Sequence, residues 1–471
     1  MKDKSSKHSK LDRSLKDRHI QFLALGGVIG VGLFYGASEA VRLAGPGVLV
    51  AYVIAGIIVA IVMRSLGEMT VERPIAGSFS SYAHQLMGPR MGFITGGMWW
   101  FFWVATVMSE LAAIGKLIQF WYPNFPAWIP GLAALVLFTL SNLLVVKVFG
   151  EIEFIFAILK VMTIIGFMIF GALMILTGVF NDGKVVGLTN LWAHDGFLPF
   201  GWVGVISVIS LVIQGYSGIE TLAVEAGESQ DPAKSLPKAF KTVTFRISFF
   251  YIGSILIMLA AYPWDELLKA GESPYILIFM KAGIPLVATA MNLLIIFSAL
   301  SSCNTGVYGA SRILYSMAED KNMPAALTKI NKNKIPYMAT YATAGAMSIG
   351  TLITYLSPDY VYIWITSASA FASLFTWIVI LVLEIMFRSR MEKSGVKLQY
   401  AMPFWPLLPI LGIVMLLGAF AAIIYSPLTR VSVFSGIGWL VILIIYYQIK
   451  IAPRNKNKEK KKVVNEVHQG I

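Results

Sequence analysis

The chain has 471 residues, of which 57% are hydrophobic and 13% are charged. Because soluble domains carry about 25% charged residues, the composition excludes a soluble enzyme or binding domain and predicts an all-α integral membrane protein. The net charge of +13 suggests nucleic-acid binding, which we reject because the basic residues follow a membrane topology. The single cysteine, Cys303, excludes an internal disulfide.

Taken in chain order, the apolar segments predict twelve transmembrane helices. They cover 20–41, 46–66, 91–121, 128–147, 152–179, 201–224, 243–262, 285–312, 338–356, 360–386, 404–426 and 431–449. The segment 1–19 is basic and lacks the apolar core and cleavage site of a signal peptide, so we expect the first span to be retained.

The charge distribution predicts a multi-pass protein of the cytoplasmic membrane with both tails, 1–19 and 450–471, in the cytoplasm. In that orientation the opposite face keeps few of the 38 Lys and Arg residues, as the positive-inside rule requires. Those few are Arg42, Lys116, Lys184, Lys269, Lys281 and Arg430.

The first span contains Leu25-Gly-Gly-Val-Ile-Gly-Val-Gly-Leu-Phe34, with four glycines in seven positions. Each glycine weakens a helix interior by about 1 kcal/mol relative to alanine. A broken helix is tolerated at membrane depth only where its backbone is buried in protein or lines a wet cavity. The N–H groups at such a break suit an anion such as a carboxylate. The alternative is that the glycines form a close-packing face between helices.

The sixth span is interrupted in a similar way at Gln214-Gly-Tyr-Ser-Gly-Ile-Glu220, five spans after the first interruption. Matching glycine-broken segments in two halves are typical of transporters built from inverted repeats. We therefore predict one repeat over 20–179 and a second over 201–386, with 404–449 appended.

Three ionisable residues inside predicted spans need a reason, because each costs at least roughly 2.5–3.5 kcal/mol on insertion scales. Lys160 can act as a proton carrier, since desolvation disfavours its charged form, or its side chain can reach the cytoplasmic interface. Glu220 can titrate during transport or cap the freed N–H groups of the break. Glu110 can face the site or pair with Lys116; we favour a mainly structural role.

The remaining polar residues point to no enzyme chemistry. Ser301, Ser302 and Asn304 in the eighth span can line an ion or substrate site, or bond across helices. The five histidines form no metal-ligand spacing, and no phosphate-binding Gly-x-x-x-x-Gly-Lys-Ser/Thr motif is present. We expect no metal, cofactor or catalytic residue. A receptor with a transporter fold or a polytopic membrane enzyme is less consistent with these features.

Several motifs make the chain resemble the bacterial amino acid transporter family of the amino acid–polyamine–organocation superfamily. The resemblance runs from about Leu15 to Lys450. The motifs are the first-span glycine segment; Arg64-Ser-Leu-Gly-Glu-Met69 with Pro74-Ile-Ala-Gly-Ser-Phe79; Val146-Lys-Val-Phe-Gly-Glu-Ile-Glu-Phe154; Gly218-Ile-Glu220 with Ala226-Gly-Glu-Ser-Gln-Asp-Pro232; and Ser301-Ser-Cys-Asn-Thr-Gly306 with Arg312.

The resemblance implies the twelve-span inverted-repeat fold first associated with sodium-coupled leucine transport, with helices 1 and 6 broken. It places the substrate carboxylate on backbone N–H groups of Gly30, Val31 and Gly32. Val31 stands where many relatives have Ser or Thr, so a hydroxyl contact would be missing there.

The resemblance also assigns the substrate ammonium and the coupling ion. The ammonium would meet carbonyl groups near Val28, Gln214 and Ser217, and Tyr216 and Glu110 would form a wall or gate. Lys160 matches a lysine that replaces a sodium ion in proton-coupled relatives, close to Gly27 and to Ser301 and Ser302. Lys160 and Glu220 are then the candidates for proton coupling.

Together these arguments predict a secondary transporter that imports an amino acid, most simply a neutral one, by proton symport and alternating access. The alternatives are an amino acid exchanger without proton coupling, or a transporter of basic or aromatic amino acids. The expected partners are the amino acid, the proton and membrane lipids, with no nucleic acid.

Overall fold

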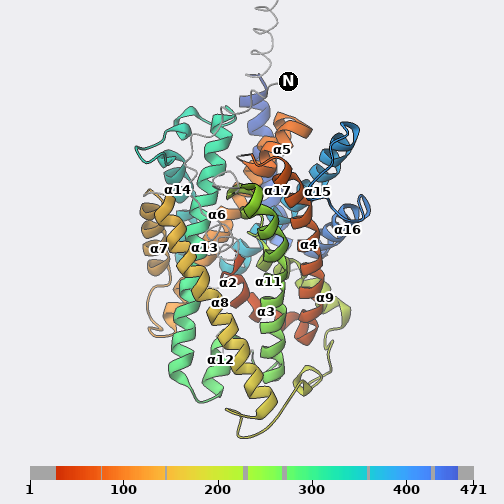
Figure 1. Ribbon diagram of the computed structural model, residues 1–471. Coiled ribbons are helices and arrows are strands. Elements are labelled where there is room, and N and C mark those ends of the chain that lie inside the picture. Colours follow the sequence, from red (N-terminus) through yellow and green to blue (C-terminus); the bar gives the residue numbers. More distant parts are fainter. Residues whose placement is uncertain are drawn as a thin grey trace, which may run out of the picture.

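The computed structural model describes residues 28–34, 36–75, 77–143, 146–225, 232–267, 273–357, 361–425 and 430–453. The predicted tail 1–19, Gly27 and nearly all of the tail 450–471 lie outside these residues. Within them every regular element is a helix, and the longer helices lie side by side in one bundle (Figure 1).

The first part of the bundle runs to residue 191. Its elements are α2 (Val31–Phe34), α3 (Gly36–Ala44), η1 (Gly45–Gly47), α4 (Val48–Glu72), α5 (Ser78–Met87), α6 (Pro89–Gln119), α7 (Trp128–Ser141), α8 (Val146–Thr177) and η2 (Thr189–Leu191).

The second part begins at the second interrupted segment. Its elements are α9 (Gly201–Tyr216), α10 (Thr221–Glu225), α11 (Pro232–Ala261), α12 (Pro274–Lys281), α13 (Pro285–Glu319), η4 (Ala325–Thr328), α14 (Tyr337–Leu356), α15 (Val361–Lys393), α16 (Leu407–Tyr425), α17 (Arg430–Tyr446) and the π-helical turn η5 (Tyr447–Ile451).

Among the described residues, nine helical segments are long and apolar enough to cross a membrane. They are Val31–Glu72, Pro89–Gln119, Glu153–Thr177, Gly201–Val224, Leu236–Ala261, Pro285–Glu319, Ile365–Lys393, Leu407–Tyr425 and Val433–Ile451. The predicted spans 128–147 and 338–356 correspond to α7 and α14, which are helical but are not among these nine. The chain is therefore a multi-pass membrane protein, and the number twelve stays a prediction.

Large apolar side chains cover the outside of the bundle. Met162 and Leu176 on α8, Phe245 on α11 and Leu286 at the start of α13 are all exposed. An exposed apolar surface of this extent is unsuited to water and suits lipid.

Several helices begin or end at different residues from those predicted. The helix α11 begins at Pro232 and α13 continues to Glu319, whereas the apolar segments predict 243 and 312. Hydropathy reports only the part of a helix that can lie in the bilayer, and helical hydrogen bonding continues into the polar flank. The short helix α5 lies between the predicted spans 46–66 and 91–121.

Helix α6 forms the centre of the bundle and packs most extensively against α13 and α15. Trp99 and Trp103 of α6 are fully buried. A Cβ atom added to Gly306 of α13 would lie 2.7 Å from the Trp103 ring, so the glycine allows the close approach. This packing fixes α6, and with it Glu110, next to the interrupted segments.

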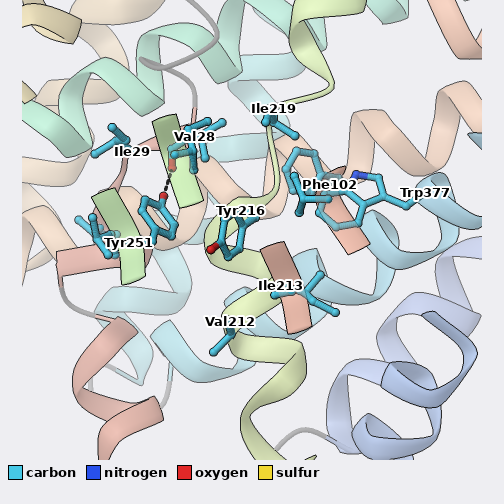
Figure 2. Close-up of a cluster of buried hydrophobic side chains, with 14 of the residues drawn as sticks. Val28, Ile29, Phe102, Val212, Ile213, Tyr216, Ile219, Tyr251 and Trp377 are labelled. Carbon is cyan, nitrogen blue, oxygen red and sulfur yellow. Dashed lines mark hydrogen bonds between the residues drawn. The ribbon is translucent and has the colours of Figure 1, made fainter. Parts of the chain in front are cut away.

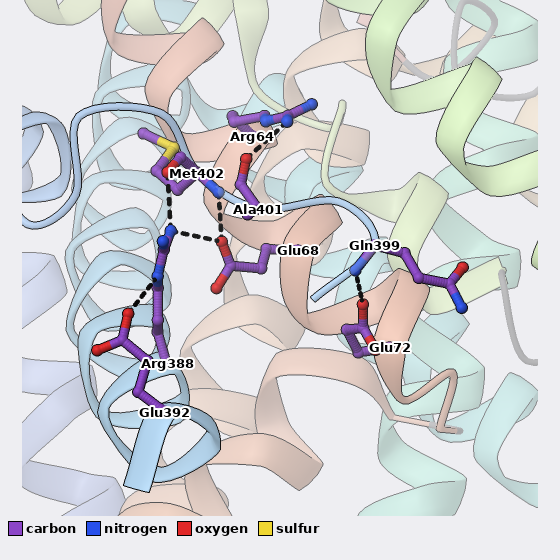
Figure 3. Close-up of polar contacts among 8 residues, drawn as sticks. All are labelled: Arg64, Glu68, Glu72, Arg388, Glu392, Gln399, Ala401 and Met402. Carbon is purple, nitrogen blue, oxygen red and sulfur yellow. Dashed lines mark hydrogen bonds and ion pairs between the residues drawn. The ribbon is translucent and has the colours of Figure 1, made fainter. Parts of the chain in front are cut away.

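A polar cluster ties α4 and α15 to the connection that follows α15, at the end of α4 that leads into α5 (Figure 3). Arg388 lies 3.5 Å from the Glu68 carboxylate and donates to the Met402 carbonyl at 2.7 Å. Arg64 donates to the Ala401 carbonyl at 2.7 Å. These bonds satisfy charges where the helices leave the apolar part of the bundle.

A substitution at Gly115 tests the packing of α6 against the start of α7. A Cβ atom there would lie 2.0 Å from the carbonyl oxygen of Ala127, and a backbone oxygen cannot move aside cheaply. We expect Gly115→Ala to destabilise the protein by about 1–3 kcal/mol, measured as a lower unfolding temperature in detergent. The control is Gly166→Ala in α8, where an added Cβ meets no atom within 4 Å; equal effects of the two changes would contradict this packing.

Candidate functional site

The first interrupted segment is a short non-helical stretch ahead of α2. Ile29 and Gly30 belong to no helix, and the Gly30 N–H donates to the Val28 carbonyl at 3.0 Å. The first helical residue, Val31, donates its N–H to Oε2 of Glu110 on α6 at 3.2 Å. A carboxylate thus satisfies a backbone group that the break leaves without a helical partner.

The second interrupted segment separates α9 from α10 and confirms the predicted break. The turn runs over 217–220, and Gly218 has a φ of +99°, a conformation that L side chains rarely adopt. The Gly218 N–H donates to Glu220 at 3.1 Å. The chain therefore turns at a glycine, the residue type that adopts a positive φ most easily.

The two breaks face each other and are joined by Tyr251 of α11, which the sequence analysis missed. Its hydroxyl lies 3.0 Å from the Val28 carbonyl oxygen and 2.7 Å from that of Gly215, and Figure 2 shows it between the two segments. A Cβ atom on Gly32 would lie 3.5 Å from the Gly215 Cα atom. The backbones of the two broken helices are therefore nearly in contact.

A cavity of about 20 Å³ lies between the breaks. It is lined by Val28, Gly30, Val31, Gly32, Thr106, Ser109, Glu110, Gln214, Gly215, Ser217, Ser302 and Thr366. That volume is room for about one water molecule. An amino acid can enter only if side chains or helices move.

The structure brings most of the predicted substrate-binding residues to this cavity. The three residues predicted for the carboxylate and the three predicted for the ammonium all line it, together with Glu110 and Ser302. They come from both broken helices, from α6 and from α13. Thr106, Ser109 and Thr366 were missed, because a lone hydroxyl residue in an apolar span carries no sequence signal for the direction in which it points.

The groups predicted to bind an ammonium already have neighbours within hydrogen-bond distance in this structure. The Val28 carbonyl accepts from the Gly30 N–H. It also lies 3.0 Å from the Tyr251 hydroxyl, whose single proton can go instead to the Gly215 carbonyl at 2.7 Å. The Ser217 hydroxyl lies 2.6 Å from the Ser373 hydroxyl.

Two side-chain oxygens at the cavity remain without a hydrogen-bond partner among the described residues. They are Oε1 of Gln214 and Oγ1 of Thr366. Both residues are at least nine-tenths buried. These oxygens are therefore the better candidates to meet an ammonium group.

Lys160 of α8 is buried, with 3% of its surface exposed. The alternative that its side chain reaches water at the interface is therefore wrong for this structure. Its ammonium interacts electrostatically with Glu153 and Glu110. The buried lysine therefore interacts with two buried carboxylates.

Glu153 lies about two helical turns before Lys160 on α8. It was not predicted as a site residue. It accepts from Oγ of Ser301 and from Nδ2 of Asn304, both at 2.6 Å. Ser301 thus serves the Glu153 carboxylate, whereas Ser302 lines the cavity and bonds Glu110. Glu153 lies at the start of the predicted span 152–179, and the sequence analysis gave it no site role.

Glu220 is fully buried and accepts from three N–H groups. Trp99 Nε1 donates at 3.0 Å, Trp377 Nε1 at 3.2 Å and the Gly218 N–H at 3.1 Å. These contacts favour the capping interpretation of Glu220. Its predicted role in proton coupling stays a prediction.

Tyr216 lies beside the cavity and is not among the described residues that line it. Its hydroxyl donates to the Tyr52 carbonyl at 3.3 Å, and its ring centroid lies 4.9 Å from that of Tyr251 (Figure 2). Its predicted role as a wall over the substrate stays a prediction, and its contacts here are those of a packing residue.

A multi-pass helical bundle with two interrupted helices around a buried polar cavity defines a membrane transport protein. Residues 19–462 match the family model for amino acid permeases, and the chain belongs to this family. It is a transporter and not an enzyme.

The relatives cover almost the whole chain. The chain is 43% identical over 439 residues to the uncharacterized amino acid permease YtnA of Bacillus subtilis, covering 93% of this chain and 95% of that protein. It is 39% identical to the probable threonine/serine transporter YbxG of the same organism, over 94% and 96% of the two chains. It is 38% identical to the aromatic amino acid transport protein AroP of Salmonella typhimurium, over 96% and 98%.

The variant Glu220→Gln separates capping from titration. Glutamine keeps the shape but turns one acceptor into a donor that meets the N–H groups of Trp99, Trp377 or Gly218. We expect a loss of about 1–3 kcal/mol, seen as a lower unfolding temperature, with the pH dependence of residual amino acid uptake unchanged. A changed pH dependence at unchanged stability would contradict the capping role.

Proposed function

We propose that the chain imports a neutral amino acid across the cytoplasmic membrane by proton symport and alternating access. The observation that supports this most directly is the buried Lys160, which interacts electrostatically with Glu110, the carboxylate that accepts the Val31 N–H at the first break. Both interrupted helices line one cavity. An amine out of water can gain and lose a proton during a transport cycle. No metal ion is needed in this scheme.

In the proposed complex the substrate carboxylate binds the N–H groups of Val31 and Gly32, next to Gly30. These groups lie at the positive end of the helix that follows the break. The ammonium group binds Oε1 of Gln214 and Oγ1 of Thr366, the oxygens without partners. A zwitterion then bridges α2, the end of α9 and α15.

Lys160 is the proposed site of the coupling proton. Protonated, its charge balances a carboxylate in the interior, as a sodium ion would. Deprotonated, the same position carries no cation and leaves Glu110 and Glu153 without their nearest positive charge. The conformations facing the two sides of the membrane would then differ in how well they hold the proton. Glu220, the other candidate, is held by three N–H donors and is the weaker of the two.

The proposed architecture is the twelve-span fold with inverted repeats over 20–179 and 201–386. The breaks ahead of α2 and after α9 are its counterparts in the two halves. The proposed orientation places α5 and the connection between α13 and α14, which lie at one end of the bundle (Figure 1), in the cytoplasm. That end carries Lys321, Lys329, Lys332 and Lys334, as the positive-inside rule favours.

The proposed substrate is a neutral amino acid of small or medium size. Glu110 is the only charged residue among the described lining of the cavity, and Thr106, Ser109 and Thr366 supply hydroxyl groups. The name of YbxG, a probable threonine/serine transporter, fits such a lining. The name of AroP keeps aromatic amino acids as a second candidate, which would require the cavity to enlarge further; basic substrates are a third.

Exchange of amino acids without protons is the alternative mechanism. It requires the same binding site, and it differs in making no use of the charge state of Lys160. Counterflow of labelled substrate in the absence of any pH gradient would occur in both cases. Only the proton symporter would accumulate substrate in response to a pH gradient.

The variant Lys160→Met tests the proposal in liposomes. Methionine keeps most of the volume and removes the charge. With the amino acid that most raises the unfolding temperature of the parent protein, we expect accumulation driven by an inward pH gradient to be lost and counterflow to be retained.

The matched control is Lys281→Met at the bundle surface, where the lysine pairs with Glu266 at 2.7 Å; it should transport like the parent. If Lys160→Met still accumulates substrate as the parent does, Lys160 is not the proton site. If the parent shows only counterflow, the protein is an exchanger.

A further inference from the structure

The Glu110 carboxylate occupies the position that the proposed function assigns to the substrate carboxylate. Its Oε2 atom accepts the Val31 N–H at 3.2 Å. A Cβ atom on Gly30 would lie 2.2 Å from its Oε1 atom, so the carboxylate lies directly against the backbone of the break. Glu110 is buried, with 4% of its surface exposed.

The cavity cannot hold both carboxylates. Its volume is about 20 Å³, room for about one water molecule. One backbone N–H group cannot make a full hydrogen bond to two carboxylates, and two adjacent negative charges repel each other in the interior. An amino acid can therefore use Val31 only after the Glu110 side chain has moved away.

Two side-chain oxygens in the lining of the same cavity indicate a ligand independently of the break. Oε1 of Gln214 and Oγ1 of Thr366 are buried and have no partner among the described residues. Buried polar atoms are usually hydrogen-bonded. Both oxygens are acceptors, which an ammonium group in the cavity would satisfy.

The surroundings of Glu110 define where its carboxylate can go. The ionisable groups that interact with it are Lys160 on α8, Cys303 on α13 and Tyr251 on α11, and Lys160 also interacts with Glu153. Lys160 is the only basic group among these described groups, and Ser302 already donates a hydrogen bond to the carboxylate. A displaced Glu110 would therefore turn toward Lys160.

We propose that Glu110 is a built-in competitor of the substrate carboxylate, and that its displacement by substrate toward Lys160 couples amino acid binding to proton uptake. This inference rests on the proposed function. A carboxylate that moves closer to an amine stabilises the protonated amine. The proton ends on Nζ of Lys160, and no covalent bond other than N–H forms. By linkage, protons then tighten substrate binding as much as substrate tightens proton binding.

Substrate binding to Glu110→Gln tests the inference. Glutamine can still accept the Val31 N–H through a neutral oxygen, so the break stays capped, but it competes less well than a carboxylate. We expect the dissociation constant of the labelled amino acid to fall roughly tenfold, the effect of one charge-assisted hydrogen bond. We also expect the affinity to lose most of its increase at acidic pH. Glu110→Asp, whose shorter side chain lies farther from Val31, should shift affinity in the same direction.

The control is Glu266→Gln, the same chemical change at a half-exposed residue in the connection after α11. This variant should bind the amino acid like the parent protein. A second measurement needs no variant: amino acid added to the parent protein in weakly buffered solution should cause net proton uptake. An amino acid amide, which has no carboxylate to displace Glu110, should cause none.

Unchanged or weaker binding by both Glu110 variants would overturn the inference, as would equal proton uptake with the acid and its amide. These failures are distinct from failure of the proposed function. If the parent binds amino acids without any dependence on pH, proton symport itself is wrong. If the parent is pH-dependent and Glu110→Gln is equally so, only the role of Glu110 is wrong.

Discussion

The structure depends on one constraint: peptide N–H and C=O groups released by a broken helix must find partners where no lipid can supply them. The buried polar side chains near the centre of the bundle meet this need. Glu110 binds the Val31 N–H, Ser298 donates to the Ile29 carbonyl at 2.7 Å, and Tyr251 joins both breaks. The second break is capped by Glu220. The polar groups that make the breaks tolerable also form the lining of the cavity.

The same constraint explains why the interior contains charge. Once Glu110 caps a break, a cation nearby lowers the cost of its burial. When protonated, Lys160 supplies that cation, and it also interacts with Glu153, which Ser301 and Asn304 hold in place. Neutral donors thus fix the Glu153 carboxylate. The Glu110 carboxylate binds a backbone N–H group that is also the proposed site of the substrate carboxylate. This asymmetry is what makes Glu110, and not Glu153, the group that can move.

The sequence predicted the features that follow from composition and local pattern. Glycine density located the breaks at 29–30 and 217–220, and hydropathy identified most of the spans. The cost of a buried charge drew attention to Lys160 and Glu110. It missed Tyr251, Thr366 and Glu153, because their roles depend on which helix faces which, and an apolar span carries little periodic signal about its orientation. It assigned the Val28 carbonyl to the substrate, and this stays a prediction; the oxygen accepts from the Gly30 N–H and lies 3.0 Å from the Tyr251 hydroxyl.

The most direct test of this account is an experimental structure of the protein with a bound amino acid, in which the distance from the Val31 nitrogen to each carboxylate is measured. The account predicts that the substrate carboxylate accepts the N–H groups of Val31 and Gly32, and that the Glu110 carboxylate lies next to Nζ of Lys160. A substrate bound elsewhere, or bound while Glu110 still accepts the Val31 N–H, would contradict it.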